Sequence, residues 1–209
     1  MSDLGCGRVQ PPDPDPPATP RPAATVILLR RGGKHKDRGL EVCMVQRNAE
    51  ARFMPSVWVF PGGAVDDGDG SGDEGHRVAG ARELAEEAGI EIHPSELVAY
   101  SRWITPRAVP IRFDTRFYLA LAPAHSPPEP DGSETVAAGW FAPKDALAAH
   151  AEGEMELVFP TIKHLESLLP YGNAEEALDA ARRREVRPVE PKVVGEGAER
   201  RIELPDELP

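Results

Sequence analysis

Short apolar runs separated by polar, glycine-rich or proline-rich breaks cover the first two thirds of the chain, a pattern typical of strands joined by loops. The run "AATVILLRR" (23–31) predicts a buried strand. After a polar loop, "LEVCMVQR" (40–47) alternates well enough to predict the returning strand of a hairpin. We expect the remaining strands at 57–63, 97–105, 112–122 and 134–143.

Helical spacing of apolar positions occurs in the middle of the chain and again near its end. From Glu74 to Ala88 the apolar residues gather on one side of a helix, and Gly89 is suited to end it in a left-handed conformation. Strands, an inserted helix, and then strands and helices again predict an α/β (α+β) fold with a mixed sheet. We expect the later helices at 144–153, 160–169 and 173–185.

Prolines concentrate at both ends of the chain. Seven of the first 22 residues are proline, and because proline lacks a backbone N–H donor, we expect residues 1–22 to form a disordered arm. Residues 186–209 are again rich in proline and charge, and we expect an extended tail there. The pattern therefore predicts one domain at 23–185 between the two ends.

Composition narrows the class of function. The chain has 209 residues, 40% of them hydrophobic, which is enough for one core. A formal net charge of −11 argues against general nucleic-acid binding, which needs a basic face. No segment approaches the roughly 20 apolar residues of a membrane helix. Cys6 and Cys43 have neither metal-ligand nor disulfide spacing. We expect a cytoplasmic protein without a nucleic-acid or membrane partner.

The stretch "RELAEEAGI" (82–90) places Glu83, Glu86 and Glu87 on one face of the predicted helix. An ordinary solvated acidic face has the same pattern. At the C-terminal end of a helix, however, the dipole is already negative and acids are unfavourable. The preceding "FPGG" ends in glycines that let backbone carbonyls approach a ligand closely. Clustered carboxylates beside such a backbone predict a site for Mg²⁺ or Mn²⁺.

These residues resemble the signature of the Nudix hydrolase family, G-x5-E-x7-R-E-U-x-E-E-x-G-U, in which U is a bulky aliphatic residue. Seven residues separate Glu74 from Arg82, and every fixed position from Glu74 to Ile90 is matched. Between Gly63 and Glu74 there are ten residues where the signature has five. The additional residues are rich in glycine and aspartate, and we expect them to lengthen the loop without moving the glutamates.

The resemblance implies a Nudix-type α/β/α sandwich over about residues 23–170. The reaction that it implies is hydrolysis of a nucleoside diphosphate linked to another group. It also implies that Glu86 and Glu87 are the principal metal ligands, and that Glu83 is a further ligand or orients the attacking water. The carbonyl of Gly63 is an additional candidate ligand.

Other residues are expected to complete this site. By its position in the signature, Arg82 would fix a carboxylate, and Glu74 would brace the junction of loop and helix through a salt bridge. Glu83 and Glu134 are both candidates for the general base, because Nudix sites often take an acid from outside the signature. For Glu134, a surface glutamate without a role is the alternative.

An anionic substrate also needs cations. Arg112, Asp114 and Arg116 alternate along a predicted strand and share one face, which suits substrate binding with Asp114 orienting the arginines. The alternative is a ladder of charge pairs across neighbouring strands at the surface. Arg47, at the end of the second strand, is a further candidate for substrate binding.

Segments outside the signature are similar to the Nudix branch that includes peroxisomal coenzyme A diphosphatases. Alternatives within the enzyme class are cleavage of ADP-ribose or NADH, and nucleoside triphosphate sanitation. A catalytically silent Nudix domain that senses a nucleotide and regulates a partner is the alternative from another class. Nudix enzymes are often homodimers, and the helices at 160–185 are our candidate interface. The similar segments are "QRNAEARFMPSVWVFPGGAVD" (46–66), "RWITPRAVPIRFDTRFYLAL" (102–121) and "FPTIKHLESL" (159–168).

Overall fold

The computed structural model describes residues 17–31, 39–51, 54–195 and 201–205 of the chain. Most of the expected arm, and most of the loop between the first two strands, lie outside these ranges. Eight strands form one mixed sheet. They are β1 (Arg21–Arg31), β2 (Leu40–Arg47), β3 (Trp58–Val59), β4 (Gly62–Ala64), β5 (Val98–Ile104), β6 (Phe113–Leu121), β7 (Thr135–Phe141) and β8 (Pro188–Val189).

β1 is the strand around which the sheet is organised. On one side it runs parallel to β6, and on the other it pairs antiparallel, first with β4 and then with β2. The strand order is β3-β2-β1-β6-β5-β8, with β4 beside β1 and β7 beside β2. Residues Val26 to Leu29 are completely buried, because both faces of β1 are covered. This double coverage explains the unbroken apolar run in the sequence.

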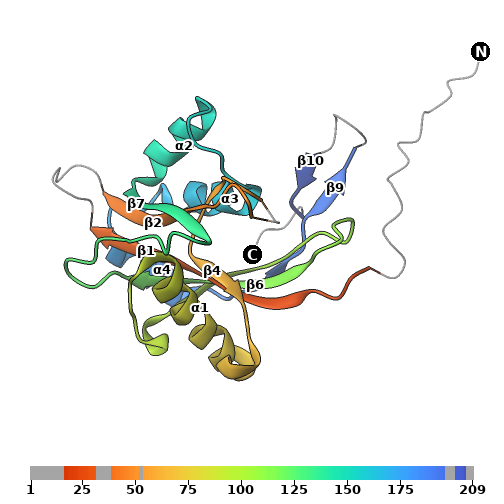
Figure 1. The fold of residues 1–209 in the computed structure, drawn as a ribbon, viewed down its shortest axis with the longest axis horizontal. Helices are drawn as coiled ribbons and strands as arrows, with labels where there is room; N and C mark the ends of the chain where they lie inside the picture. Colours follow the sequence, from red (N-terminus) through yellow and green to blue (C-terminus); the bar gives the residue numbers. More distant parts are fainter. Residues whose placement is uncertain (1–16, 32–38, 52–53, 196–200, 206–209) are drawn as a thin grey trace, which may run out of the picture.

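Helices cover the two faces of the sheet, as Figure 1 shows. The first helix packs on one face, where Leu84 joins Leu28 in an apolar cluster. The other three helices lie on the opposite face, where Leu165 packs with Ile27. This arrangement is the α/β/α sandwich that the sequence predicts. The helices are α1 (Gly72–Ala88), α2 (Pro143–Ala151), α3 (Phe159–Leu168) and α4 (Ala174–Arg183).

The ends of α1 follow from its sequence. The helix begins at Gly72, two residues before the expected start, and ends at Ala88. Gly89 has a φ of 65°, and its N–H donates to the carbonyl of Ala85, as expected of a left-handed helix end. The last turn contains no basic residue, so nothing within it opposes the negative end of the helix dipole.

Several segments differ from the expected elements. The strand expected at 57–63 is divided at Pro61, which cannot donate to a ladder and whose carbonyl instead accepts from Val26. β1 begins inside the expected arm, at Arg21, beside β6. In the expected tail, β8 extends the sheet next to β5 and buries Val189. A separate two-stranded sheet follows, formed by β9 (Lys192–Val194) and β10 (Arg201–Glu203).

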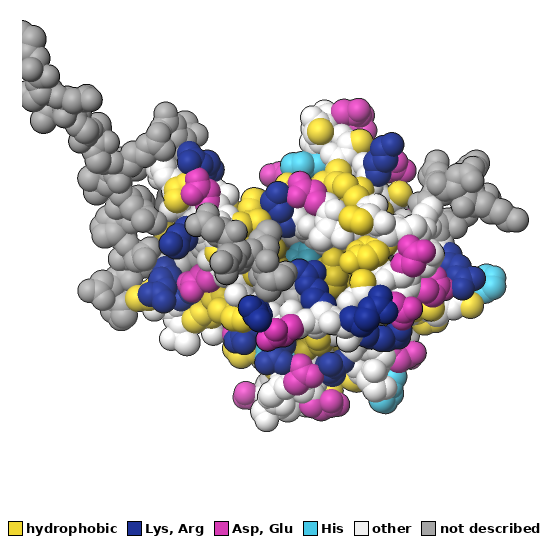
Figure 2. Space-filling view, turned by 180° about the vertical axis from the view of Figure 1, so that it is seen from behind, with side chains coloured by type: hydrophobic (Ala, Val, Ile, Leu, Met, Phe, Trp, Pro, Cys, Tyr) yellow, Lys and Arg dark blue, Asp and Glu magenta, His cyan; other side chains and the backbone are white. Residues whose placement is uncertain are grey.

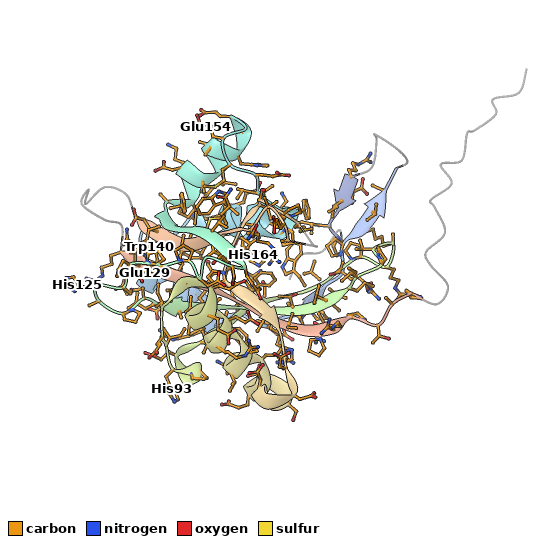
Figure 3. The ribbon with its side chains drawn as sticks, in the orientation of Figure 1. His93, His125, Glu129, Trp140, Glu154 and His164 are labelled. Atoms are coloured by element: carbon orange, nitrogen blue, oxygen red, sulfur yellow. The ribbon has the colours of Figure 1, made fainter. Side chains whose placement is uncertain are left out.

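Two views show how polar side chains are distributed. On the face drawn in Figure 2, Lys and Arg side chains are interspersed with Asp and Glu. Figure 3 shows His164 in the centre of the molecule, whereas His93 and His125 lie at its periphery. Within the described ranges, no helix combines the length and the apolar character needed to cross a membrane.

Arg112 joins both ends of the domain to the sheet. It lies just before β6 and is 6% exposed. Its guanidinium donates to the carbonyls of Ala18 and Thr105 and to the carboxylate of Glu190, the last at 2.7 Å. These bonds connect the segment before β1 and the segment after β8.

Replacing Arg112 with alanine should lower the free energy of unfolding by about 2–4 kcal/mol, because three partly buried hydrogen bonds and the packing of a buried side chain are lost. Urea denaturation measures this change. Arg107→Ala is a matched control, since Arg107 also reaches Glu190, at 3.5 Å, but its side chain is 60% exposed. That exposed contact should contribute less than about 1 kcal/mol. Equal losses from the two variants would contradict the structural role of Arg112.

Candidate active site

Glu87 is the most deeply buried acid at the C-terminal end of α1, with 4% of its surface exposed. Its carboxylate accepts a hydrogen bond of 2.9 Å from the backbone N–H of Gly62. Burial, reinforced by the carboxylates of Glu83 and Glu134, raises the pKa of Glu87 to about 7, although Gly62 and Arg47 act in the opposite direction. Glu87 is therefore an acid that titrates near neutral pH.

Glu83 lies against the backbone of Gly63 in β4. A side chain at position 63 would meet the Glu83 carboxylate, which would have to move, so glycine permits the present close approach of β4 and Glu83. The Glu83 side chain is 14% exposed, and burial raises its pKa as well. Two acids with disfavoured ionisation therefore meet the glycine pair of the "FPGG" segment.

Arg82 connects the loop after β4 to the acids of α1. Its Nη1 donates to Glu83 at 3.0 Å and to Glu86 at 2.9 Å. Its Nε and Nη2 donate to the two carboxylate oxygens of Asp69, at 3.1 and 2.9 Å. Nη2 also donates to the carbonyl of Ala64 at 3.1 Å. One guanidinium thus holds three carboxylates and the backbone at the end of β4.

Asp69, and not Glu74, braces the loop against the helix. Glu74 is exposed and forms no ion pair with any described residue, so the expected salt bridge is absent there. Asp69 is buried, and its hydrogen bond from Arg82 holds the pKa of the Asp69 carboxyl below its ordinary value. Five residues separate Gly63 from Asp69, which is the spacing between the glycine and the first acid of the signature. The additional residues therefore follow the acid and extend the start of α1.

Glu134 enters the neighbourhood from the turn before β7. The carboxylate of Asp131 accepts hydrogen bonds from consecutive backbone N–H groups, including that of Glu134. The hydroxyl of Thr135 donates to the carbonyl of Glu87 at 2.9 Å, which fixes the turn on the end of α1. The charge of Glu134 raises the pKa of both Glu83 and Glu87, so the three carboxylates lie near one another.

Arg47, at the end of β2, lies near the same cluster. Its positive charge lowers the pKa of Glu87, which places the guanidinium near that carboxylate. The Nε of Arg47 is buried and has no hydrogen-bond partner within the described part of the chain. A buried donor without a partner is rare and costs about 1–3 kcal/mol. Arg47 therefore has an unused donor near the acids.

The structure does not bring the two other arginines to this cluster. Arg112 belongs to the buried junction described above. Arg116 pairs with Asp73 at 2.5 Å near the start of α1, and the length of helix between Asp73 and Glu87 is about 21 Å. Asp114 does not orient these arginines. Its two carboxylate oxygens accept hydrogen bonds from Nε and Nη2 of Arg102 in β5, at 2.8 and 2.6 Å. Of the three residues, only Asp114 thus pairs with a neighbouring strand, whereas Arg112 and Arg116 bind residues outside the neighbouring strands or at the start of α1.

Sequence reasoning missed three residues that build the site. Asp69 could have been found from its spacing to Gly63, but the matching spacing of Glu74 to Arg82 concealed it. Asp131 and Thr135 act through a turn that closes on a helix far away in sequence. No local pattern identifies such a contact.

The donor chemistry of the cluster fits a divalent cation. Carboxylate oxygens are the ligands that Mg²⁺ and Mn²⁺ prefer. In the arrangement of the described residues, no three Asp, Glu, His or Cys side chains stand close enough to hold one ion. Arg82 lies between Glu83 and Glu86, but the Glu86 side chain is 59% exposed and can rotate away from it. The raised pKa values of Glu83 and Glu87 indicate a lack of counter-charge that a cation would supply.

Comparison with known proteins assigns the chain to a family. The sandwich, with a glycine pair facing acids at the end of its first helix, defines a Nudix-type domain. A family model described as NUDIX domain matches residues 19–162, which is more than half of the chain. The chain belongs to the Nudix family, and it is similar to a solved NUDIX hydrolase.

Three individual proteins illustrate the similarity. "Putative nudix hydrolase 7" of Caenorhabditis elegans is 28% identical to this chain over 183 residues. The match covers 71% of this chain and 60% of the length of that protein. The NUDIX hydrolase structure from Alicyclobacillus acidocaldarius has a TM-score of 0.68 at 29% identity, covering 77% of this chain and 96% of that one. The NUDIX domain of Shewanella oneidensis NrtR, solved with ADP ribose, shares the fold with a TM-score of 0.56 at 19% identity, covering 77% and 93%.

Asp69→Ala should destabilise the protein by about 1–3 kcal/mol, because Arg82 loses a charge-assisted pair of hydrogen bonds in a partly buried site. Glu74→Ala, an exposed change on the same structural unit, should alter stability by less than about 0.5 kcal/mol. Thermal and urea unfolding of the two variants measures the difference. The reverse ranking would restore Glu74 as the brace and refute Asp69.

Glu87→Gln should stabilise the protein at pH 8 in the presence of EDTA. The pKa of Glu87 is raised in the folded state, so folding retains a proton that the unfolded chain releases above its ordinary pKa. Stability therefore falls as pH rises from about 4.5 to about 7, by roughly 3 kcal/mol in total. Glutamine keeps the acceptor for Gly62 without this cost.

Urea unfolding at pH 5 and at pH 8 measures this effect, with the exposed Glu91→Gln as the control. The gain from Glu87→Gln should be largest at pH 8 and small at pH 5, whereas Glu91→Gln should show no such difference. A Glu87→Gln variant that is destabilised equally at both pH values would rule out the strained ionisation of Glu87.

Proposed function

We propose that the chain hydrolyses the diphosphate linkage of a nucleoside diphosphate derivative, with Mg²⁺ or Mn²⁺ as its cofactor. The observation that carries the proposal is the burial of Glu83 and Glu87 against the glycine backbone at the acidic end of α1. Acids in that position reduce stability, because desolvation and the helix dipole both disfavour their charge. A divalent cation and an anionic substrate together account for a cluster that folding alone does not favour.

The residues of the cluster have distinct parts in this reaction. Glu83, Glu86 and Glu87 would hold the divalent ion, with the carbonyl of Gly63 as a further candidate ligand. The ion, when bound, neutralises charge on the diphosphate and lowers the pKa of a coordinated water. Arg82 orients the carboxylates through the hydrogen bonds described above.

Substrate contact and proton transfer involve residues at the edge of the cluster. Arg47 offers its unused Nε–H donor to a phosphate oxygen. Glu83 and Glu134 are two candidates for accepting the proton of the attacking water. The raised pKa of Glu83 suits a general base better than an ordinary carboxyl group does. Glu134 has the advantage of a backbone held by the Asp131 turn.

Substrates with a coenzyme A, ADP-ribose or NADH framework all fit this proposal. Similarity of the segments at 46–66, 102–121 and 159–168 to the coenzyme A diphosphatase branch supports CoA or acyl-CoA as the first to test. The ADP ribose bound by the Shewanella domain makes ADP-ribose the second. We also propose that the protein is cytoplasmic, which the free and buried thiol of Cys43 supports. We further propose that it forms a homodimer.

A substrate screen with Mg²⁺ and Mn²⁺ tests the proposal directly. The panel comprises CoA, acyl-CoA, ADP-ribose, NADH, diadenosine polyphosphates and nucleoside triphosphates, with the products identified by mass. Glu86→Gln and Glu87→Gln should lower kcat by more than the roughly 10–100-fold that mutations around a metal site cost. Glu74→Gln, which removes an exposed acid from the same helix, is the matched control and should retain activity.

Two results would contradict hydrolysis at this site. Undiminished turnover in Glu86→Gln and Glu87→Gln would place the reaction elsewhere. Binding of a panel member without any turnover would favour the nucleotide-sensing regulator, and turnover of triphosphates alone would favour sanitation.

A further inference from the structure

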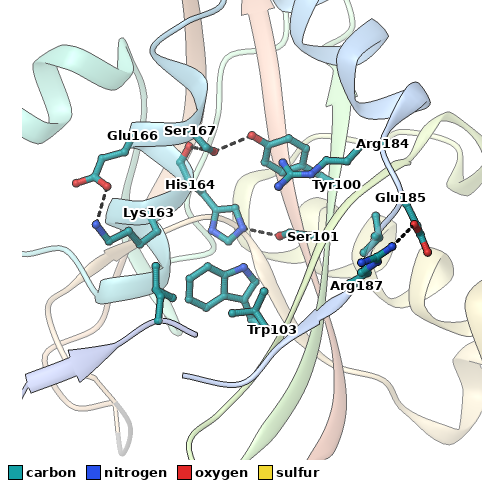
Figure 4. A pocket seen from close by; sticks show the side chains of 13 residues that line it. Tyr100, Ser101, Trp103, Lys163, His164, Glu166, Ser167, Arg184, Glu185 and Arg187 are labelled. Atoms are coloured by element: carbon teal, nitrogen blue, oxygen red, sulfur yellow. Dashed lines mark hydrogen bonds and ion pairs between the residues drawn. The ribbon is translucent and has the colours of Figure 1, made fainter. Parts of the chain in front are cut away.

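One cavity is lined entirely by residues outside the glutamate cluster. It encloses about 360 Å³ between β5, α3 and the segment that follows α4, as Figure 4 shows. Its lining includes none of the metal-ligand candidates. Its volume is near the lower end of the roughly 300–1,000 Å³ that is typical of small-molecule sites.

Most of this cavity is formed by residues beyond the match to the family model, which ends at residue 162. Within the match, only Tyr100, Ser101 and Trp103 of β5 line the cavity. The remaining lining comes from α3 after residue 162, from the segment 184–189 and from Leu204. Membership of the Nudix family therefore does not account for this feature.

The floor of the cavity is aromatic, and its polar groups bind one another. A bulge in β5 between Ala99 and Ser101 interrupts the regular alternation of the strand. The Ser101 hydroxyl lies 2.6 Å from Nε2 of His164, and the Tyr100 hydroxyl lies 2.7 Å from the Ser167 hydroxyl. Because these four groups are already paired with one another, they have little hydrogen-bonding capacity left for water.

Trp103 supplies the ring surface of this floor. Its indole lies 5.4 Å from the ring of His164 and 6.2 Å from that of Phe159, measured between centroids. The indole Nε1–H has no hydrogen-bond partner among the described residues. A planar ligand can stack on such a surface, and a ring nitrogen or carbonyl can accept from the indole.

The rim of the cavity is cationic within a strongly acidic chain. Lys163, Arg184 and Arg187 line it together with two carboxylates, whereas the whole chain has a formal net charge of −11. Arg187 pairs with Glu185 at 2.9 Å with both side chains more than 60% exposed, and Lys163 pairs with Glu166 at 2.8 Å. Exposed pairs contribute only about 0–1 kcal/mol, so an anionic ligand can replace a carboxylate at small cost.

We propose that this cavity binds a planar ring that carries an anionic group, a ligand of the size of a nucleoside monophosphate. The ring stacks on Trp103, and the anionic group faces Lys163 and Arg187. The ligand is either the nucleoside part of the substrate or a separate nucleotide. The proposal does not rest on hydrolysis, because a monophosphate has no diphosphate linkage to cleave.

Titration calorimetry of the full chain with AMP, in EDTA, tests this site. AMP should bind at least about tenfold more tightly than adenosine, which lacks the anion, or ribose 5-phosphate, which lacks the ring. Trp103→Leu should weaken AMP binding by roughly tenfold or more, since stacking of a base on an aromatic ring supplies that much. Trp103→Phe keeps a ring and should retain most of the binding.

A matched pair of surface variants tests whether the cationic rim of the cavity, and not the overall charge of the protein, binds the anionic group. Arg187→Gln should weaken AMP binding several-fold. Arg201→Gln should not, although Arg201 is similarly exposed and also pairs with a glutamate two residues away. Both side chains lie at the surface, so this pair still tests the proposed site if Trp103→Leu fails to fold. Absence of AMP binding, or equal binding by Arg187→Gln and Arg201→Gln, would overturn the proposal.

Competition assays identify the source of the ligand. If the substrate places its own ring in the cavity, AMP inhibits competitively, and Trp103→Leu raises KM with little change in kcat. If the ligand is a separate nucleotide, AMP and substrate bind together, and KM is unchanged in Trp103→Leu. Either result supports a site that binds a planar ring carrying an anionic group. Failure of hydrolysis in every assay would leave the AMP titration intact and would count only against the proposed function.

Discussion

The hydrogen bonds of Arg82 are the interaction on which the arrangement of the glutamate cluster depends. Glutamates crowded at the negative end of a helix dipole repel both the dipole and one another. Arg82 offsets part of this repulsion by holding Glu83 and Glu86, and through Asp69 it anchors the loop that follows β4. Buried Glu87 receives no hydrogen bond from it, and a divalent cation would neutralise the negative charge that remains.

The short strand β4 makes the cluster geometrically possible. Because β4 and β2 pair with successive parts of β1 on the same side, the glycine pair lies against α1. A side chain at Gly62 would meet the backbone of β1, so this position does not tolerate bulk, and one at Gly63 would displace the Glu83 carboxylate. The main-chain N–H of Gly62 therefore reaches the carboxylate of Glu87 at 2.9 Å.

Spacing along the sequence predicted the features of the site that lie within one helix or strand. It failed for contacts between side chains of different elements. The glutamates of α1 share a helix face, so their positions follow from the period of the helix. Two acids have spacings that match the signature at the junction of loop and helix, Asp69 relative to Gly63 and Glu74 relative to Arg82. The structure selects Asp69, which is buried and bound to Arg82, over the exposed Glu74. Alternation placed Asp114 and Arg116 on one face of β6, where the charge of Arg116 does act on Asp114. It contained no information on which side chains the neighbouring strand and the start of α1 present to them.

The amino-acid sequence by itself determined the order of strands and helices from β1 to α4, the left-handed end of α1 at Gly89 and the crowding of acids before it. These properties depend on residues within a few positions of one another. Only the tertiary structure decided that Glu87 is buried against Gly62, that Thr135 fixes the Glu134 turn, and that the chain after α4 returns to enclose a cavity on β5. Burial and long-range hydrogen bonds arise when distant segments pack, and packing is a property of the whole chain.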